Sequence, residues 1–379
     1  MATPQLSPGV LVREVDLTIG RAENVLDNIG AIAGPFEIGP VDDIIEISTE
    51  EGLVNTFGKP IGRDAQYEYW MSASSFLSYG GVLKVVRTAG SNLNNANAGV
   101  GVASTAVLQV YNYDDYLNNH QSDATFTYCA KNPGTWANTL KVCQIDNFAD
   151  QTIGISTNNL YNAGARVGFA VTANIDGQVI PGIGTTGSLT GFLKGIITGV
   201  STDSTNSNST FDVKITDRIS AIGGITTYYP IDYAEGNQIA AFKSDSSIQF
   251  LNNSGVTTGH SANAAYTPAS VKDWYDEQTL GINNATVYWK TLAPKPLDSN
   301  YVDTRKGKND GMHVVVVDDD GRVTGIKGNI IEKHLNLSKA KDTVSSVNPP
   351  LKTYYKDYLA LYSDNVYAGK NPSEGPDTQ

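Results

Sequence analysis

Residues 311–342 read GMHVVVVDDDGRVTGIKGNIIEKHLNLSKAKD and carry the strongest pattern of secondary structure in the chain. The β-branched run at 313–317 has the composition of a buried strand. A tight turn is expected at Gly321, because glycine accepts the positive φ of hairpin turns, and a second strand is predicted over 322–326. Apolar residues then recur at roughly helical spacing over 330–337, which predicts a short helix.

Three adjacent carboxylates, Asp318, Asp319 and Asp320, follow the first of these strands. Because they are neighbours in sequence, their side chains cannot all point at one metal ion. A calcium loop needs acidic residues at alternating positions and a later glutamate, and that pattern is absent. The pattern therefore favours a turn over a metal site.

The overall composition is that of a folded protein. The chain has 379 residues, and this length is enough for two or three domains. Of these residues 40% are hydrophobic and 17% are charged, a composition that fits a folded protein. Its net charge of −12 argues against a nucleic-acid partner, since phosphate contacts need a basic surface.

The charge is unevenly distributed. Residues 1–90 hold 6 Lys or Arg against 12 Asp or Glu, a net of −6, whereas residues 255–379 hold 14 against 15. Either a solvated acidic surface or a subunit interface would account for this asymmetry.

Two cysteines, Cys129 and Cys143, flank the loop at 131–138. The sequence favours free, partly buried thiols in a reducing cytoplasm over a disulfide. The amino terminus has no basic-then-apolar signal, and no apolar run approaches membrane-spanning length. We therefore expect assembly in a cytoplasm and no membrane insertion.

Residues 1–23 are predicted to form an extended amino-terminal arm. Apolar and polar residues are interspersed over 10–17, which predicts a strand with no obvious partner nearby. Two alternatives remain open from the residues alone. The strand could pair with the sheet of another subunit, or it could fold back as an edge strand of its own domain.

The next segment has a β-β-α-α-β pattern. Its elements are predicted as strands at 28–36 and 41–47, helices at 49–57 and 65–79, and a strand at 82–87. Ser48 is the expected N-cap of the first helix, with Glu51 completing a capping box, and Gly58 is expected to end that helix.

Beyond a linker at 89–100 the pattern changes to short strands with many Asn, Ser, Thr and Gly residues. Residues 98–250 are therefore predicted to form one or two β-rich insertions that protrude from the first domain. Within them, Trp136 is expected to anchor its loop structurally.

Helical patterning returns at 267–281, followed by a predicted strand at 284–292. We expect these elements to complete the sheet begun by residues 28–88. The predicted fold class is thus α+β, with a discontinuous mixed sheet-and-helix domain made from 24–89 and 255–362. Residues 363–379 read as a polar tail.

No catalytic or cofactor-binding constellation is found. Residues 182–187 match the glycine pattern of dinucleotide-binding loops, but no parallel β-α-β context surrounds them, so a glycine-rich loop is favoured. The four histidines, His120, His260, His313 and His334, are scattered without metal-ligand spacing. We therefore predict no enzymatic activity, no cofactor and no metal.

Six segments resemble the tail sheath proteins of contractile-tailed bacteriophages, especially those of T-even-like phages and their marine relatives. They are SPGVLVREVD (7–16), LVNTFGKP (53–60), FLSYGGVLKVVR (76–87), KNPGTWANTLKV (131–142), TLGINNATVYWKTLAPKP (279–296) and the stretch from Val314 to Asp342. They occur in the family's order and touch both ends and the middle of the chain.

The resemblance implies a structural subunit of the virion tail. Such subunits stack as hexameric rings around a tail tube, and their contraction drives the tube through the host envelope. The implied partners are other copies, the tail tube protein, and the baseplate and tail terminator proteins. The inter-subunit arm would carry Val10, Val12, Arg13, Val15 and Leu17.

Family members of this type continue with a further α/β portion, so residues 363–379 are expected to begin a missing carboxy-terminal part. Two other function classes remain as alternatives. One is a receptor-binding or decoration protein that acts through the β-rich middle. The other is a nucleotide-dependent enzyme, which only the glycine pattern at 182–187 supports.

Overall fold

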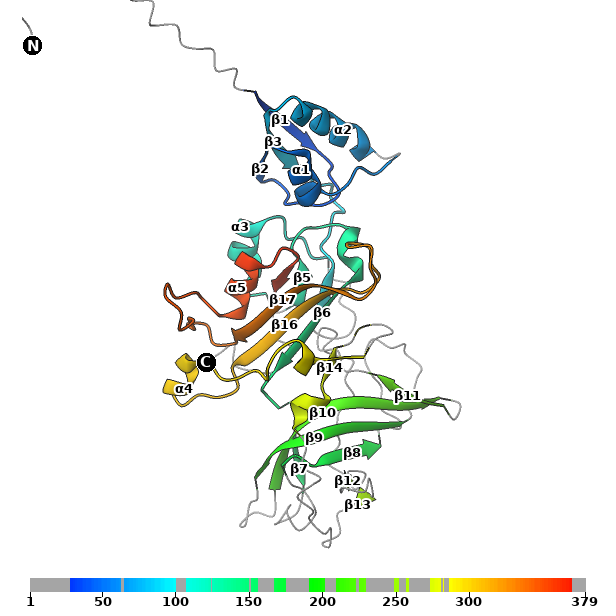
Figure 1. Ribbon diagram of the computed structural model, residues 1–379, viewed down its shortest axis with the longest axis vertical. Helices are drawn as coiled ribbons and strands as arrows, with labels where there is room; N and C mark the ends of the chain where they lie inside the picture. Colours follow the sequence, from blue (N-terminus) through cyan, green and yellow to red (C-terminus); the bar gives the residue numbers. More distant parts are fainter. Residues whose placement is uncertain are drawn as a thin grey trace, which may run out of the picture. The chain divides into compact units, whose positions relative to one another are not determined.

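The computed structural model describes residues 28–62, 65–99, 107–123, 125–149, 151–155, 167–174, 191–201, 209–222, 225–229, 249–251, 257–258, 273–280, 282 and 286–369 (Figure 1). The chain divides into two compact units, and each is described by itself. The first comprises Met1–Glu37 and Asp43–Thr88, and the second comprises Ile38–Asp42 and Ala89–Gln379.

The first unit is a small sheet backed by two helices. Its elements are β1 (Ile29–Gly34), β2 (Ile44–Ile47), α1 (Glu50–Phe57), α2 (Ala65–Ser78) and β3 (Val82–Arg87). The strand order is β1-β3-β2, with β1 parallel and β2 antiparallel to the central strand β3. This matches the predicted β-β-α-α-β order.

The helices pack on one face of this sheet. Their shared core contains Leu53, Phe57, Trp70 and Val85, all at most 4% exposed. Burying each such side chain stabilises the fold by about 1.5–3 kcal/mol. Helix α2 approaches β1 closely because Gly34 has no side chain: a Cβ there would lie 2.6 Å from a ring carbon of Tyr69.

The ends of α1 follow the expected chemistry with one correction. Thr49, not the predicted Ser48, is the N-cap, and its Oγ1 accepts a hydrogen bond from Gly52 N at 3.1 Å. The predicted capping box is absent, because with Thr49 as N-cap the third helical position is Gly52, which has no side chain. At the other end Gly58 has φ 83° and donates its N–H to Val54 O.

Two three-stranded sheets form the centre of the second unit. One has the order β17-β16-β6, from β6 (Leu140–Asp146), β16 (Gly311–Asp318) and β17 (Asn329–Ser338). The other has the order β18-β5-β4, from β4 (Asn97–Gly99), β5 (Phe126–Ala130) and β18 (Val366–Ala368).

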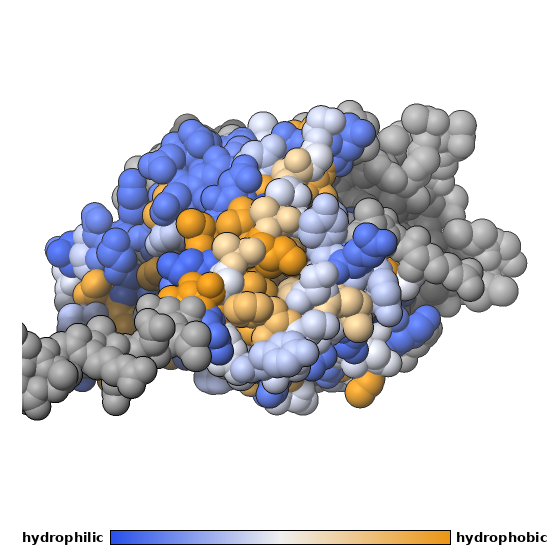
Figure 2. All heavy atoms as spheres, turned by 90° about the horizontal axis from the view of Figure 1, so that it is seen from above, coloured by the Kyte–Doolittle hydropathy of each residue, from blue (hydrophilic) through white to orange (hydrophobic). Residues whose placement is uncertain are grey.

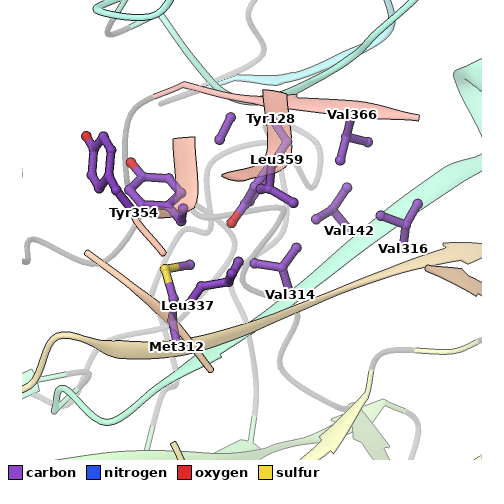
Figure 3. Packing of buried hydrophobic residues seen from close by; sticks show 11 residues of the cluster. Tyr128, Val142, Met312, Val314, Val316, Leu337, Tyr354, Leu359 and Val366 are labelled. Atoms are coloured by element: carbon purple, nitrogen blue, oxygen red, sulfur yellow. The ribbon is translucent and has the colours of Figure 1, made fainter. Parts of the chain in front are cut away.

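Strand β16 is buried along its whole length, which explains its continuous apolar run. Its even-numbered residues Met312, Val314 and Val316 face a cluster that includes Leu359 of α5 (Tyr355–Tyr362) and Val366 of β18 (Figure 3). Its odd-numbered valines pack in a second cluster with residues of the segment around β14 and β15. The run is therefore the central strand of a sheet that is covered on both faces.

The helix predicted over 330–337 was wrong, because these residues belong to strand β17. The pairing shifts by one residue between Met312 and Val314 and again between Val316 and Val317. Such bulges interrupt the strict alternation of a strand. The apolar spacing along β17 therefore resembled a helical period.

The strand predicted over 322–326 was also wrong. Residues 319–328 form turns, and the chain returns as a strand only at Asn329. Glycines at 321, 325 and 328 all have positive φ, with 76° at Gly321. The excursion is thus a longer loop than a two-residue hairpin turn.

The middle of the chain is β-rich, as its composition predicts. A seven-stranded sheet has the order β11-β10-β9-β8-β12-β13, and β7 also pairs with β10. The strands are β7 (Gln151–Ile155), β8 (Ala170–Asn174), β9 (Gly191–Ser201), β10 (Ser209–Ile222), β11 (Ile225–Tyr229), β12 (Gln249–Leu251) and β13 (Thr257–Thr258).

The strand pairing links segments that the sequence assigned to different domains. Strands β5 and β6, placed by composition in the protruding insertion 98–250, pair with β18 and β16. Among the described residues, β1, β2 and β3 pair only with one another and do not join β16. Partners separated by about 170 residues in sequence leave no local signal.

The remaining elements are short. They are α3 (Tyr113–Asp115), a π-helical turn (Tyr116–His120), 3-10 turns (Thr135–Thr139, Trp274–Glu277 and Trp289–Thr291), β14 (Thr279–Leu280), β15 (Val287–Tyr288) and α4 (Asn300–Thr304). Of the strand predicted at 284–292, the described residues contain only β15 as a strand. Of the helix predicted at 267–281, they contain only the 3-10 turn Trp274–Glu277 as helical structure. The predicted polar tail 363–379 actually begins with buried β18.

Candidate functional site

The acidic triplet after β16 serves the backbone of its own loop. The Asp318 side chain is fully buried; its Oδ1 accepts a hydrogen bond from Arg322 N at 3.1 Å, and its Oδ2 accepts from Val323 N at 2.9 Å and Thr324 N at 2.7 Å. Asp319 lies 3.9 Å from Lys141 Nζ. Within the described ranges, no group of three or more His, Cys, Asp or Glu residues is placed to hold a metal ion.

The histidines are held separately. His313 is buried; its Nδ1 accepts a hydrogen bond from Asn336 N at 3.0 Å, and its Nε2 donates to Pro294 O at 2.7 Å. Burial lowers the pKa of His313, so its ring is neutral at pH 7. His334 instead lies beside Glu332 and Tyr358, and His260 lies outside the described residues.

Both cysteines are buried thiols outside any disulfide, in β5 and β6. Burial raises the pKa of the Cys129 thiol well above its usual range. A buried thiol of this kind is unreactive, because the thiolate is the nucleophile.

A buried ionic cluster joins the middle sheet to the sheet of β16. Asp146 at the end of β6 accepts from Lys214 of β10 at 3.0 Å and from Lys339, just after β17, at 3.3 Å. All three side chains are at most 4% exposed. Breaking such a buried pair costs about 3–5 kcal/mol, because a charge is left uncompensated.

A second polar cluster fixes the turn between α5 and β18. Glu332 accepts hydrogen bonds from Ser363 Oγ at 2.6 Å, from Asp364 N at 2.9 Å and from Asn365 Nδ2. Burial alone would raise the pKa of Glu332, but the bonds from His334, Ser363 and Asn365 outweigh it and hold that pKa below its usual range. In both clusters the carboxylate, Asp146 or Glu332, accepts from donors that hold strands and turns of the fold together.

The structural residues singled out in the sequence are placed as follows. Trp136 is 7% exposed, packs with Ala130 and Ala137, and donates its Nε1–H to Asn132 O at 3.0 Å. Gly58 and Gly321 have positive φ at the end of α1 and in the loop after β16. The arm residues Val10, Val12, Arg13, Val15 and Leu17, and the glycine pattern at 182–187, lie outside the described residues.

One sheet face of the first unit is open and apolar. The side of β1-β3-β2 away from α1 and α2 carries Ile29 and Ile44, which are 57% and 63% exposed, and the exposed alanines at 31 and 33. An ion pair between Lys84 Nζ and Glu46 Oε1 at 3.2 Å crosses this face. Figure 2, which views the end where Figure 1 draws α2 and β1, shows apolar residues gathered among polar ones.

In the described part of the chain, no helix is long and apolar enough to cross a membrane. Exposed apolar patches on folded proteins commonly mark protein contacts, and the open face of β1-β3-β2 is such a patch.

Comparison with known proteins gives two relevant matches. The chain is 42% identical over 82 residues to the tail sheath protein of Enterobacteria phage T4, which is 22% of this chain and 12% of that protein. It is 39% identical over 84 residues to the tail sheath protein of Vibrio phage KVP40, again 22% of this chain and 12% of the relative. No family model matches the chain.

The matches thus cover a minor part of this chain and a smaller part of each relative. Both relatives are tail sheath proteins of phages, and one is the T-even phage T4 itself. The resemblance to bacteriophage tail sheath proteins that the sequence motifs indicate is confirmed.

Proposed function

We propose that the chain is a structural subunit of a bacteriophage tail sheath, without enzymatic activity. The observation that carries this proposal is the identity of 42% over 82 residues and of 39% over 84 residues, 22% of this chain in each case, to two tail sheath proteins. The clusters of ionisable side chains described above support it, because each is used to hold strands and loops together. Function would then arise from contacts between copies.

In this proposal the subunits polymerise around the tail tube and contract as a lattice. The work comes from the difference in contact free energy between two arrangements of the same subunits, and no chemical step is needed. The further partners would be the tube protein, the baseplate and the tail terminator, and assembly would take place in the host cytoplasm.

The amino-terminal arm is proposed to link neighbouring copies. Apolar and polar residues are interspersed over 10–17, which suits a strand that adds to a foreign sheet edge. Removing residues 1–20 should leave both compact units folded while weakening lattice contacts. Val12→Pro should act similarly, because proline removes a ladder donor.

Immunogold electron microscopy of virions tests the proposal. Antibodies against this chain should label the tail along its length and follow it when the tail shortens. Label confined to fibre tips or to the capsid would refute the sheath proposal and favour a receptor-binding or decoration protein. For the arm, sheaths that polymerise equally well without residues 1–20 would refute its role.

A further inference from the structure

The acidic first unit and a basic turn of the second unit carry complementary surfaces. We propose that the open face of β1-β3-β2 in one copy docks against the turn at 303–308 of a second copy. This inference rests on the proposed function, because it assumes that copies of the chain associate.

The open face is apolar, is crossed by the Lys84–Glu46 ion pair and has Asp43 at its border. Ile44, on the edge strand β2, is 63% exposed. Asp43 lies directly before β2 and Glu46 lies on it, so the two carboxylates flank Ile44. Residues 28–88 hold 8 Asp or Glu against 4 Lys or Arg, a net of −4. One of those four bases, Arg87, is buried and donates to Phe36 O and Glu37 O, so the surface is more acidic than this count.

The basic turn presents three cations together. Arg305, Lys306 and Lys308 are exposed within four residues. Of the acidic neighbours, Asp298 accepts from Asn309 N at 2.6 Å and Asp310 is 1% exposed, so Asp303 is the one exposed carboxylate beside the three cations. The charge that this turn shows to solvent is therefore positive.

An exposed apolar residue accompanies these cations. Leu297 is 75% exposed, and its backbone packs against Gly311 at the start of β16, next to the end of the turn. The turn therefore offers an apolar side chain and three cations to a surface that offers two isoleucines and an acidic border. This match of charge and polarity favours a second copy as the occupant, since patterns of this kind guide association.

The backbone of the turn supports a role for its central cation. Lys306 has φ 61°, a conformation that is costly for residues other than glycine. The turn is fixed by Gly307 N donating to Val302 O at 2.9 Å and by Lys306 N donating to Asp303 O at 3.0 Å. A lysine at a position where glycine would be less strained points to use of its side chain.

Zero-length carbodiimide cross-linking of mixed isotopic copies tests the inference. Equal amounts of unlabelled and ¹⁵N-labelled chain are mixed at high concentration, and linked peptides are identified by mass spectrometry. Amide links from Lys306 or Lys308 to Asp43 or Glu46 should include light–heavy pairs as often as unmixed ones. The Lys84–Glu46 link within one chain should give only unmixed pairs, which provides an internal control.

Variants that leave the reactive groups intact sharpen the test. Ile44→Ser should reduce the yield of mixed pairs several-fold. The matched control Val347→Ser changes a residue of similar exposure, 64%, and should not. Raising the salt concentration should also reduce the yield, because exposed charges are screened.

Lys306→Gly gives an independent signature. It should raise the thermal midpoint of the chain, since the strained residue is relieved. It should also lower the yield of mixed Lys308 links. A purely structural turn would show the first effect without the second, and that result would overturn the inference.

The outcomes separate this inference from the proposed function, because polymers are scored by electron microscopy in the same samples. If polymers form but the links from Lys306 or Lys308 to Asp43 or Glu46 are absent, or occur only between peptides of the same isotope, the docking inference alone is overturned. Mixed pairs without polymers would support the docking and count against polymerisation. Absence of both would overturn both.

Discussion

Replacing Asp318 tests whether the acidic triplet serves the loop or a ligand. Asp318→Ala removes the acceptor of the hydrogen bonds from the N–H groups of Arg322, Val323 and Thr324. The loop is largely exposed, so water can replace part of what is lost, and each bond then contributes about 1 kcal/mol. We expect a loss of about 3 kcal/mol in the free energy of unfolding of the second unit.

Urea unfolding followed by far-UV circular dichroism measures this loss. Asp318→Asn keeps one acceptor oxygen and should lose about half as much. The matched control Asp320→Ala removes an exposed carboxylate of the same triplet and should change stability by less than about 0.5 kcal/mol. Calcium should leave the midpoint of the wild-type chain unchanged, because the Asp318 oxygens are already used.

Two results would refute this reasoning. Equal losses in Asp318→Ala and Asp320→Ala would mean that the hydrogen bonds to Asp318 are not what fixes the loop. A calcium-dependent rise in the midpoint that Asp318→Asn abolishes would show that the triplet binds a metal after all.

Three further predictions concern other parts of the fold. Because the folded pKa of Glu332 is lowered, its contribution is present above its ordinary pKa and is lost as pH falls through the lowered value; Glu332→Gln should therefore flatten the acid side of the stability–pH curve, and an unchanged curve would contradict this. Trp136→Ala should cost about 3 kcal/mol in urea unfolding, and a loss under about 0.5 kcal/mol would show that the ring does not anchor its loop. Gly34→Ala should destabilise the first unit by about 1–3 kcal/mol, because the added methyl meets the Tyr69 ring; Gly62→Ala, which meets nothing within 4 Å, is its control, and equal effects would contradict the close approach.

Local patterns in the sequence predicted local structure well. The order of strands and helices in the first unit follows from alternation, helical spacing and the glycine at 58. The run at 313–317 was correctly predicted as a buried strand. Errors arose where the ladder is irregular, as in β17, whose two bulges break the alternation that identifies a strand.

Long-range pairing could not be read from composition. The sequence placed β5 and β6 in an insertion at 98–250, yet Val315 of β16 pairs with Cys143 of β6. Deleting 98–250 would therefore remove the partner of a fully buried strand as well as the β-rich sheet. The remainder would expose the β16 backbone, so such a deletion does not isolate a folded domain.

The burial of Lys214 and Lys339 could not be predicted from the sequence either. Lys214 occupies a position in β10 that reads as one polar residue in an alternating strand, and Lys339 lies in the polar stretch SKAKD at 338–342. Their burial is fixed only when the sheet of β10 meets the sheet of β16 at Asp146. An ion pair of this kind adds little net stability over apolar residues, but it disfavours arrangements in which its charges lack partners. In the sheath function proposed above, in which contacts between copies change, that specificity would direct movement to the interfaces.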